Sequence, residues 1–175
     1  MMMAVTQNKD FVISRVFDAS RDLVWQCFTQ PERMKQWWGP KGVKVVKSEM
    51  DFRVGGTYHY GMQNPNGDVM WGRMLYREIA PSERIVFINS FSDEAGGLGR
   101  HPLAPQWPLQ LLSTFTFEDV PGSKTRFTVR WSPYAATEEE QAAFDIGHAS
   151  MAAGWSGTLD KLEIHLARGQ QQAQQ

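Results

Sequence analysis

A long apolar stripe near the C-terminal end constrains the fold more than any other feature of this chain. Within residues 137–167, apolar or large side chains recur in steps of three or four, at positions 144, 148, 151, 155, 159, 162 and 166. This spacing places them on one face of a single α-helix. Thr137, with Glu140 three residues later, forms a capping-box motif at its start. Such a helix of roughly 30 residues spans about 45 Å, so it needs a large surface to pack against.

That surface is predicted to be one antiparallel sheet. Seven segments are rich in β-branched and aromatic residues, at 10–17, 43–52, 55–63, 69–79, 84–91, 111–120 and 124–131. Turn motifs such as NPNGD at 64–68 join most of them as hairpins. After the first strand, Ser20 is the expected N-cap of one short helix and Pro31 begins another, which Gly39-Pro40 ends. The expected class is therefore α+β.

Length and composition indicate one domain without a nucleic-acid or membrane partner. The 175 residues suit a single core, which we place at residues 10–168, between a flexible N-terminus at 1–9 and a disordered Gln-rich tail at 169–175. The formal net charge is −1 and basic residues are scattered along the chain, which gives no electrostatic case for nucleic acid or an anionic membrane. No apolar run approaches the ~20 residues of a membrane span.

The only cysteine, Cys27, excludes an intrachain disulfide and is typical of a cytoplasmic protein. It lies on the apolar stripe of its short helix, so it is predicted to be a small buried hydrophobe. The four histidines lack the spacing of metal ligands, and neither a metal nor a cofactor is expected. The run of glutamates at 138–140 is predicted to be a solvated first helical turn.

Aromatic residues make up 12% of the chain, and the strand patterns place many of them on inward faces. Two interpretations follow: these side chains pack as an ordinary core, or they line a ligand cavity. Residues 93–107 contain several Gly and Pro residues between two strands, which is typical of a functional loop. We expect this loop to lie over or beside a cavity opening, docked by His101 and Trp107.

The order of elements resembles the helix-grip fold of the START/Bet v 1-like (SRPBCC) superfamily, and more closely the activator of Hsp90 ATPase homologue 1-like family. The matching segments are FDASRDLVWQCFTQPERMKQWWGP at 17–40, DFRVGGTYHY at 51–60, YREIAPSERIVF at 76–87 and GHASMAAGWSGTLDKLEIHL at 147–166. The resemblance implies a seven-stranded antiparallel sheet curled around the C-terminal helix, with a hydrophobic cavity between them. Of the adjacent Trp37 and Trp38, one is expected to face the cavity or core and the other to cap the sheet edge.

The expected cavity residues combine the inward strand faces, the tryptophan pair and the helix stripe. They are Trp37, Trp38, Tyr58, Tyr60, Met62, Met74, Phe91, Phe115, Phe117, Trp131, His148, Met151 and Trp155. The inward faces carry no Lys or Arg, because Arg53, Arg73, Arg77 and Arg130 are placed at strand ends or on the outer face. A charged ligand would enter such a cavity unpaired.

Three functions fit this interpretation. The first is binding of a small apolar or aromatic molecule, including a lipid, by a cytoplasmic protein, a role compatible with a stress response. The second, implied by the wider superfamily, is a cofactor-free cyclase or hydrolase of aromatic polyketide-like substrates. Its polar candidates are His148, Tyr58, Tyr60 and Asn89, which the sequence does not assemble into an acid–base pair, so a non-catalytic role is favoured. The third is an Hsp90 co-chaperone-like interaction domain, with a protein partner or a homodimer.

Overall fold

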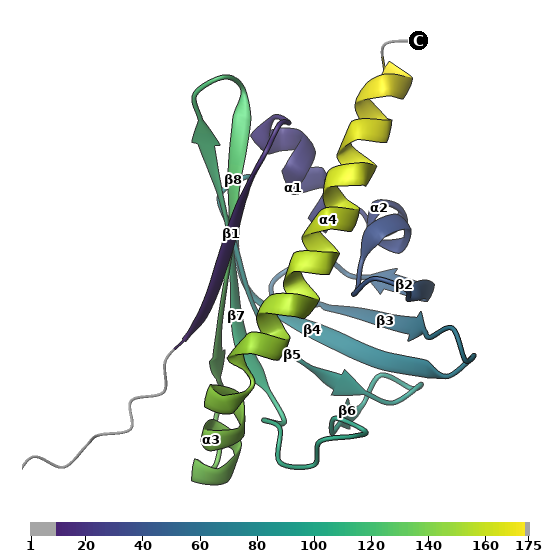
Figure 1. Cartoon of the computed structure of the whole chain (residues 1–175), viewed down its shortest axis with the longest axis vertical. Coiled ribbons are helices and arrows are strands. Elements are labelled where there is room, and N and C mark those ends of the chain that lie inside the picture. The colour runs from purple at the N-terminus through teal and green to yellow at the C-terminus, as the bar shows by residue number, and fades with distance from the viewer. Residues whose placement is uncertain (1–9, 174–175) are drawn as a thin grey trace, which may run out of the picture.

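The computed structural model describes residues 10–173 and contains a curved antiparallel sheet with a long helix across it (Figure 1). In chain order the elements are β1 (Phe11–Phe17), α1 (Arg21–Thr29), α2 (Pro31–Trp37), β2 (Lys44–Met50), β3 (Thr57–Gln63), β4 (Val69–Ala80), β5 (Arg84–Ser92), β6 (Leu98–Gly99), β7 (Leu111–Val120), β8 (Lys124–Pro133), α3 (Glu138–Ile146) and α4 (His148–Ala173). The strand order is β1-β8-β7-β5-β4-β3-β2, and β6 pairs with β5 beside this path. Every strand pair is antiparallel.

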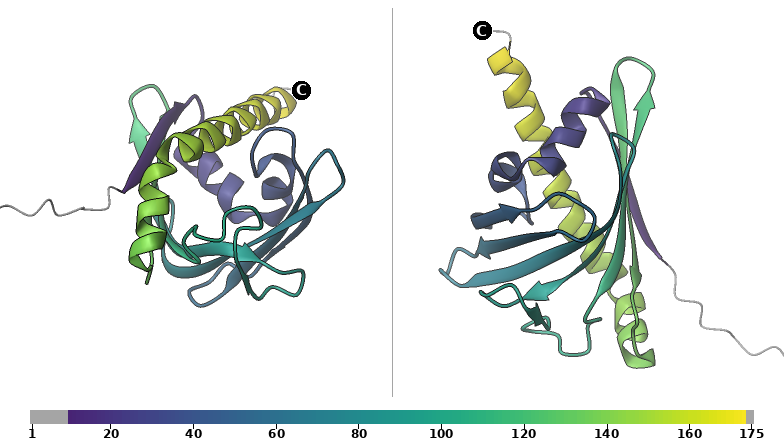
Figure 2. Two further views of the ribbon diagram at one scale, coloured as in Figure 1. Left: turned by 60° about the horizontal axis from the view of Figure 1, so that its bottom comes forward. Right: turned by 180° about the vertical axis from the view of Figure 1, so that it is seen from behind.

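The sheet curls around α4, and the short helices lie on the same side of it. Figure 2 shows α1 and α2 inside the curve, beside the C-terminal half of α4. Helix α4 contacts β1 and α2, whereas α1 contacts β7 and β8. This arrangement is the predicted helix-grip architecture.

Local sequence signals explain where the helices begin. The Ser20 hydroxyl accepts a hydrogen bond from the Leu23 N–H, as expected for an N-cap. At α3 the predicted capping box is complete, because the Thr137 side chain accepts from the Glu140 N–H and the Glu140 carboxylate accepts from the Thr137 N–H.

Three features differ from the sequence prediction, and one prediction cannot be compared. The stretch expected as one helix from 137 onward is two helices, interrupted at Gly147, whose ψ of 3° departs from helical geometry. The loop after β5 contains the two-residue strand β6, whose pairing is too short to leave a sequence pattern. Helix α4 extends to Ala173, so residues 169–173 are helical where a disordered tail was predicted. The predicted flexible N-terminus at 1–9 lies outside the described residues.

The space between sheet and helices has a densely packed half beneath α1 and α2. Phe28 of α1 lies at its centre, with ring centroids 4.5 Å from Phe127, 5.1 Å from Phe115 and 5.4 Å from Phe117. All four side chains are buried. This half is an ordinary aromatic core, and it holds the two short helices on the sheet.

The predicted stripe of the C-terminal helices faces the sheet as expected. Phe144, Met151, Trp155, Leu159 and Leu162 are all buried. Within residues 10–173, no helix combines the length and the apolar character needed to cross a membrane.

Candidate functional site

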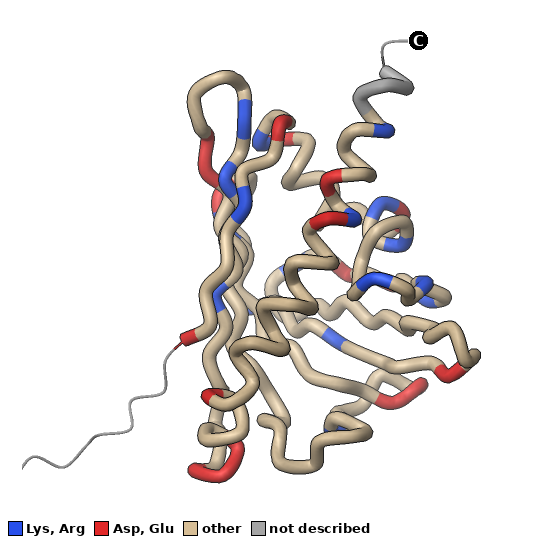
Figure 3. The backbone as a smooth tube through the Cα atoms, viewed as in Figure 1, with Lys and Arg blue, Asp and Glu red and all other residues tan. Residues whose placement is uncertain are grey.

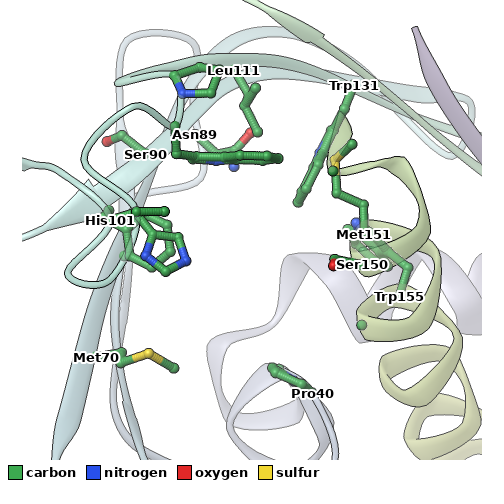
Figure 4. Close-up of a pocket in the computed structure, with 18 of the residues that line it drawn as sticks. Pro40, Met70, Asn89, Ser90, His101, Leu111, Trp131, Ser150, Met151 and Trp155 are labelled. Carbon is green, nitrogen blue, oxygen red and sulfur yellow. The ribbon is translucent and has the colours of Figure 1, made fainter. Parts of the chain in front are cut away.

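The other half of the space between sheet and helix is open and forms a cavity of about 700 Å³. Its walls come from the inner face of β3, β4, β5, β7 and β8, from the segment that follows α2, from the loop that follows β6, and from α3 and the N-terminal half of α4 (Figure 4). The lining residues are Trp38, Gly39, Pro40, Tyr60, Met62, Met70, Trp71, Gly72, Met74, Phe87, Asn89, Ser90, Phe91, His101, Ala104, Gln106, Trp107, Pro108, Leu111, Trp131, Ala143, Ile146, Gly147, Ser150, Met151, Gly154, Trp155 and Thr158.

The lining is apolar, aromatic and rich in methionine, and it contains no Lys, Arg, Asp or Glu. Polar side chains are isolated within it. The Asn89 Oδ1 already accepts a hydrogen bond from the Ser113 hydroxyl, and the Thr158 hydroxyl donates to the Gly154 carbonyl. The cavity lining is thus free of Lys and Arg, but the inward faces of the sheet are not, because Arg15 on the inward face of β1 pairs with Phe127 and bonds Asp160 of α4 outside the cavity.

The two adjacent tryptophans have different positions because α2 ends between them. Trp37 is the last residue of α2, is buried in the packed half, and donates its Nε1–H to the Cys27 carbonyl at 3.1 Å. Trp38 has extended backbone angles (φ −63°, ψ 147°), and it lines the cavity. Its ring centroid lies 5.6 Å from that of Trp155 and 5.8 Å from that of Tyr60. The change in backbone geometry thus places one indole in the core and the other in the cavity wall.

Two glycines shape the cavity. Gly72 pairs with Tyr60 across β3 and β4, and a Cβ at Gly72 would lie 2.4 Å from the Tyr60 ring. The tyrosine ring can lie flat against the wall only because residue 72 has no side chain. Gly154 lies on the cavity-lining face of α4, where an added Cβ would have no heavy atom within 4 Å. Gly154 therefore leaves space in the cavity instead of serving close packing.

The loop of residues 93–107 forms part of the cavity wall, as its composition suggested. His101 lies 4.7 Å from the Phe91 ring, and Figure 4 shows it across the cavity from Trp131 and Trp155. Trp107 packs 5.8 Å from Phe144 and so close to the helix break that a Cβ at Gly147 would lie 2.7 Å from its ring. Both predicted docking residues therefore contact the body of the domain.

A buried carboxylate fastens this loop to α3. Glu140 accepts a hydrogen bond from the Arg100 guanidinium at 2.8 Å and another from the Leu109 N–H at 3.2 Å. Its side chain is only 9% exposed, which corrects the prediction of a solvated glutamate. The hydrogen bond from the Thr137 N–H, and next the one from Arg100, hold the pKa of the Glu140 carboxyl below its usual value.

Eight of the predicted cavity residues line the cavity: Trp38, Tyr60, Met62, Met74, Phe91, Trp131, Met151 and Trp155. Five do not. Trp37, Phe115 and Phe117 instead pack against Phe28 in the core. Tyr58 is fully buried, and its hydroxyl is hydrogen bonded to the Ser48 hydroxyl at 2.8 Å. His148 packs edge-on against the rings of Phe11 and Phe144.

The strand and helix patterns could have supplied some of the residues that the prediction missed. Met70 and Gly72 share a face of β4 with Met74, so the two-residue period places them in the same wall. Gly154 lies one helical turn after the predicted Met151 on α4, and Ser150 lies one turn before Gly154. His101, Ala104 and Gln106 had no such signal because they lie in a loop without periodicity.

The ionisable groups at this site are poorly suited to proton transfer. Burial raises the pKa of Tyr60 to about 12 and keeps its hydroxyl protonated at neutral pH. Burial lowers the pKa of His101, whose Nδ1 accepts a hydrogen bond from the Leu103 N–H, so the neutral ring carries its proton on Nε2. Neither side chain has a carboxylate partner among the described residues. Burial also raises the pKa of the Cys27 thiol to about 11, consistent with an unreactive core cysteine.

No group of three or more His, Cys, Asp or Glu side chains within residues 10–173 is arranged to hold a metal ion. Asn89, another of the predicted polar candidates, lines the cavity, but its side-chain oxygen already accepts a hydrogen bond from Ser113. The cavity is therefore largely apolar, and its few hydrogen-bonding groups lie apart from one another.

Comparison with proteins of known structure supports the fold. A protein from Arthrobacter aurescens is 24% identical, with a TM-score of 0.76 over 92% of this chain and 87% of that chain. One from Rhodobacter sphaeroides is 18% identical, with a TM-score of 0.73 over 93% and 95% of the two chains. An AHSA1 protein from Silicibacter pomeroyi is 19% identical, with a TM-score of 0.68 over 92% and 99%. No curated protein is similar enough in sequence to match this chain.

The sequence model of one protein family matches residues 18–167, from the end of β1 almost to the end of the described part of α4. That range contains the tryptophan pair, the cavity walls and the loop that Glu140 fastens. The family is described as activator of Hsp90 ATPase homolog 1-like protein. The chain therefore belongs to the activator of Hsp90 ATPase homolog 1-like family.

Proposed function

We propose that this protein binds one uncharged, mainly apolar small molecule in the cavity between the sheet and α4. The observation that carries the proposal is a cavity of about 700 Å³ whose lining includes no Lys, Arg, Asp or Glu. Pockets for small ligands and cofactors typically range from about 300 to 1,000 Å³ and combine apolar walls with a few polar groups.

The wall chemistry supports a flat aromatic or short acyl ligand. Trp38, Trp131 and Trp155 offer ring faces and edges for stacking, and the methionine side chains can adapt to different shapes. Tyr60 and His101 offer hydrogen-bond donors that could orient a polar end of the ligand. A carboxylate or phosphate would lose its hydration without gaining a cationic partner, which costs several kcal/mol.

Binding is favoured over the cyclase or hydrolase alternative because the candidate catalytic groups are not assembled. His148 packs between aromatic rings outside the cavity, and Tyr60 holds its proton well above neutral pH. A general base needs hydrogen-bond reach to its substrate and a pKa near the working pH. The described residues provide no pair that meets both conditions.

The family description favours a second candidate, a co-chaperone-like interaction domain. A docking surface for a partner protein would normally present a contiguous apolar patch. The exposed large hydrophobic residues are instead distributed over several elements: Val12, Val16, Val46, Val54, Leu98, Leu103, Ile146 and Ile164. This distribution supports the small-molecule proposal.

A matched pair of fluorescent probes tests the proposal. N-phenyl-naphthylamine is uncharged, whereas anilinonaphthalene sulfonate adds one negative charge to the same ring framework. We expect saturable binding of the uncharged probe at one site, with micromolar affinity of about −8 kcal/mol, and at least tenfold weaker binding of the sulfonate. Equal or tighter binding of the sulfonate, or no saturable binding of either probe, would contradict the proposal.

A further inference from the structure

A second concave site lies on the other side of α2 from the apolar cavity. It is a groove between α2 and the C-terminal half of α4, lined by Arg33, Gln36, Lys161, Ile164, His165, Arg168 and Gly169. We call it the basic groove. Figure 3 shows Lys and Arg positions on α2 and on this part of α4, with Asp and Glu positions between them. Its lining contains two arginines, a lysine, a histidine and no carboxylate.

The cations of the basic groove make no ion pair with the described residues, whereas carboxylates elsewhere on α4 pair with cations from other elements. On the neighbouring face of α4, Asp160 binds Arg15 at 2.7 Å and Lys41 at 2.8 Å, and Glu163 also lies near Arg15. Arg33 and Arg168 have no ion pair to any of the residues 10–173. The chain therefore leaves positive charge uncompensated at this concave site.

Lys161 fixes one wall of the groove. Its ammonium group donates to the carbonyls of Trp38, Gly39 and Pro40, each at 3.2 Å. These carbonyls follow the C-terminal end of α2, where a cation is favourable. The lysine thus holds α2 against α4 and keeps its charge in a set position. Arg33 donates its Nε–H to the Gln30 side chain at 2.9 Å, so its terminal nitrogens and the guanidinium of Arg168 are the groups left for a ligand.

His165 lies within the same positive field. Its Nε2 is buried and has no hydrogen-bond partner in the described part of the chain. Burial, followed by the charges of Arg33 and Arg168, lowers its pKa. An anion in the groove would offset the repulsion between these groups and offer an acceptor to the imidazole N–H.

We propose that the basic groove binds the phosphate group of a ligand. A phosphate carries more than one negative charge and several acceptor oxygens, which matches two guanidinium groups without a carboxylate partner, a nearby imidazole and the Gln36 amide. One carboxylate would neutralise only one of the cations. The proposal is independent of the apolar cavity, whose lining excludes charged residues.

Calorimetry with inorganic pyrophosphate and vesicle co-sedimentation with phosphatidic acid test the groove with a soluble and a lipid phosphate. The groove variant is Arg33→Gln/Arg168→Gln, which retains Lys161 and its support of α2. Arg126→Gln, an exposed change on β8 remote from the groove, is the single-charge control. Binding should weaken at least tenfold in the groove variant and less than twofold in the control.

The two probes also distinguish the source of the phosphate. Saturable one-to-one binding of pyrophosphate that the groove variant loses indicates a soluble phosphate ligand. If the groove variant loses binding only to the vesicles, the ligand is a lipid headgroup. Either result supports the groove as a phosphate site. NMR of the His165 imidazole provides an independent readout, since bound phosphate should raise its pKa by offsetting the charges of Arg33 and Arg168. Absence of binding to both probes, or equal losses in the groove variant and the control, would overturn the proposal.

Discussion

Replacing Gly154 by alanine tests whether the face of α4 that lines the cavity is open. An added Cβ there has no heavy atom within 4 Å, so the substitution should introduce no clash. A glycine within a helix costs about 1 kcal/mol relative to alanine. The unfolding free energy should therefore rise by about 1 kcal/mol, which corresponds to an increase in Tm of about 2–4 °C for a chain of this size. Thermal unfolding followed by circular dichroism measures the change.

Leucine at the same position separates cavity filling from helix propensity. Gly154→Leu should also gain helix propensity, but its side chain would occupy part of the cavity. We expect the affinity for N-phenyl-naphthylamine to fall at least tenfold, or about 1.4 kcal/mol, with no loss of Tm. Ala153→Leu adds the same side chain at an exposed neighbouring position and should bind as the wild type does. A lower Tm in Gly154→Ala, or unchanged probe binding in Gly154→Leu, would refute this reasoning.

Three further predictions concern stability. Trp155→Ala should lower the unfolding free energy, measured in urea, by about 3 kcal/mol, because one side of the indole lines the cavity. Phe127→Ala in the packed half should lower it by about 5 kcal/mol. Equal losses would indicate that Trp155 is packed as tightly as Phe127. The folded-state pKa of Glu140 is lowered, so its stabilisation is complete above the unfolded pKa of about 4.3 and is lost as the pH falls through the folded value. The advantage of the wild type over Glu140→Gln should thus be larger at pH 7 than at pH 3, and a difference independent of pH would contradict the assignment. Lys161→Met should lower the unfolding free energy by about 1.5–3 kcal/mol, because it removes charged hydrogen bonds to backbone carbonyls. The same change at exposed Lys35 is the control and should lower it by less than about 0.5 kcal/mol.

Periodic patterns predicted the fold because each element repeats its signal over several residues. The two-residue period of β3 and β8 placed Tyr60 and Trp131 on inward faces, and both line the cavity. The stripe on α4 likewise placed Met151 and Trp155. The same pattern missed the break at Gly147, because the apolar stripe continues across it; a Cβ at this position would also meet Trp107, which reaches the helix from a distant loop.

The division of the interior into a packed half and an open half could not be predicted from the strand patterns. Phe115 and Phe117 have the same inward pattern as Trp131, but Phe28 from α1 fills the space in front of them. Which inward residues meet a cavity depends on where α1 and α2 dock, and that is a property of three-dimensional packing. The basic groove was missed for a similar reason, because Arg33 and Arg168 are far apart in the sequence.

Methionine methyl NMR provides the most direct test of the cavity as the ligand site. Met62, Met70, Met74 and Met151 line the cavity, whereas Met34 is buried in the packed half and serves as an internal control. On addition of N-phenyl-naphthylamine to protein with isotope-labelled methionine methyl groups, the four cavity resonances should shift together and saturate at one equivalent. The Met34 resonance should remain in place. A saturable shift of the Met34 resonance, with no shift of the four cavity resonances, would contradict the claim that the cavity is the ligand site.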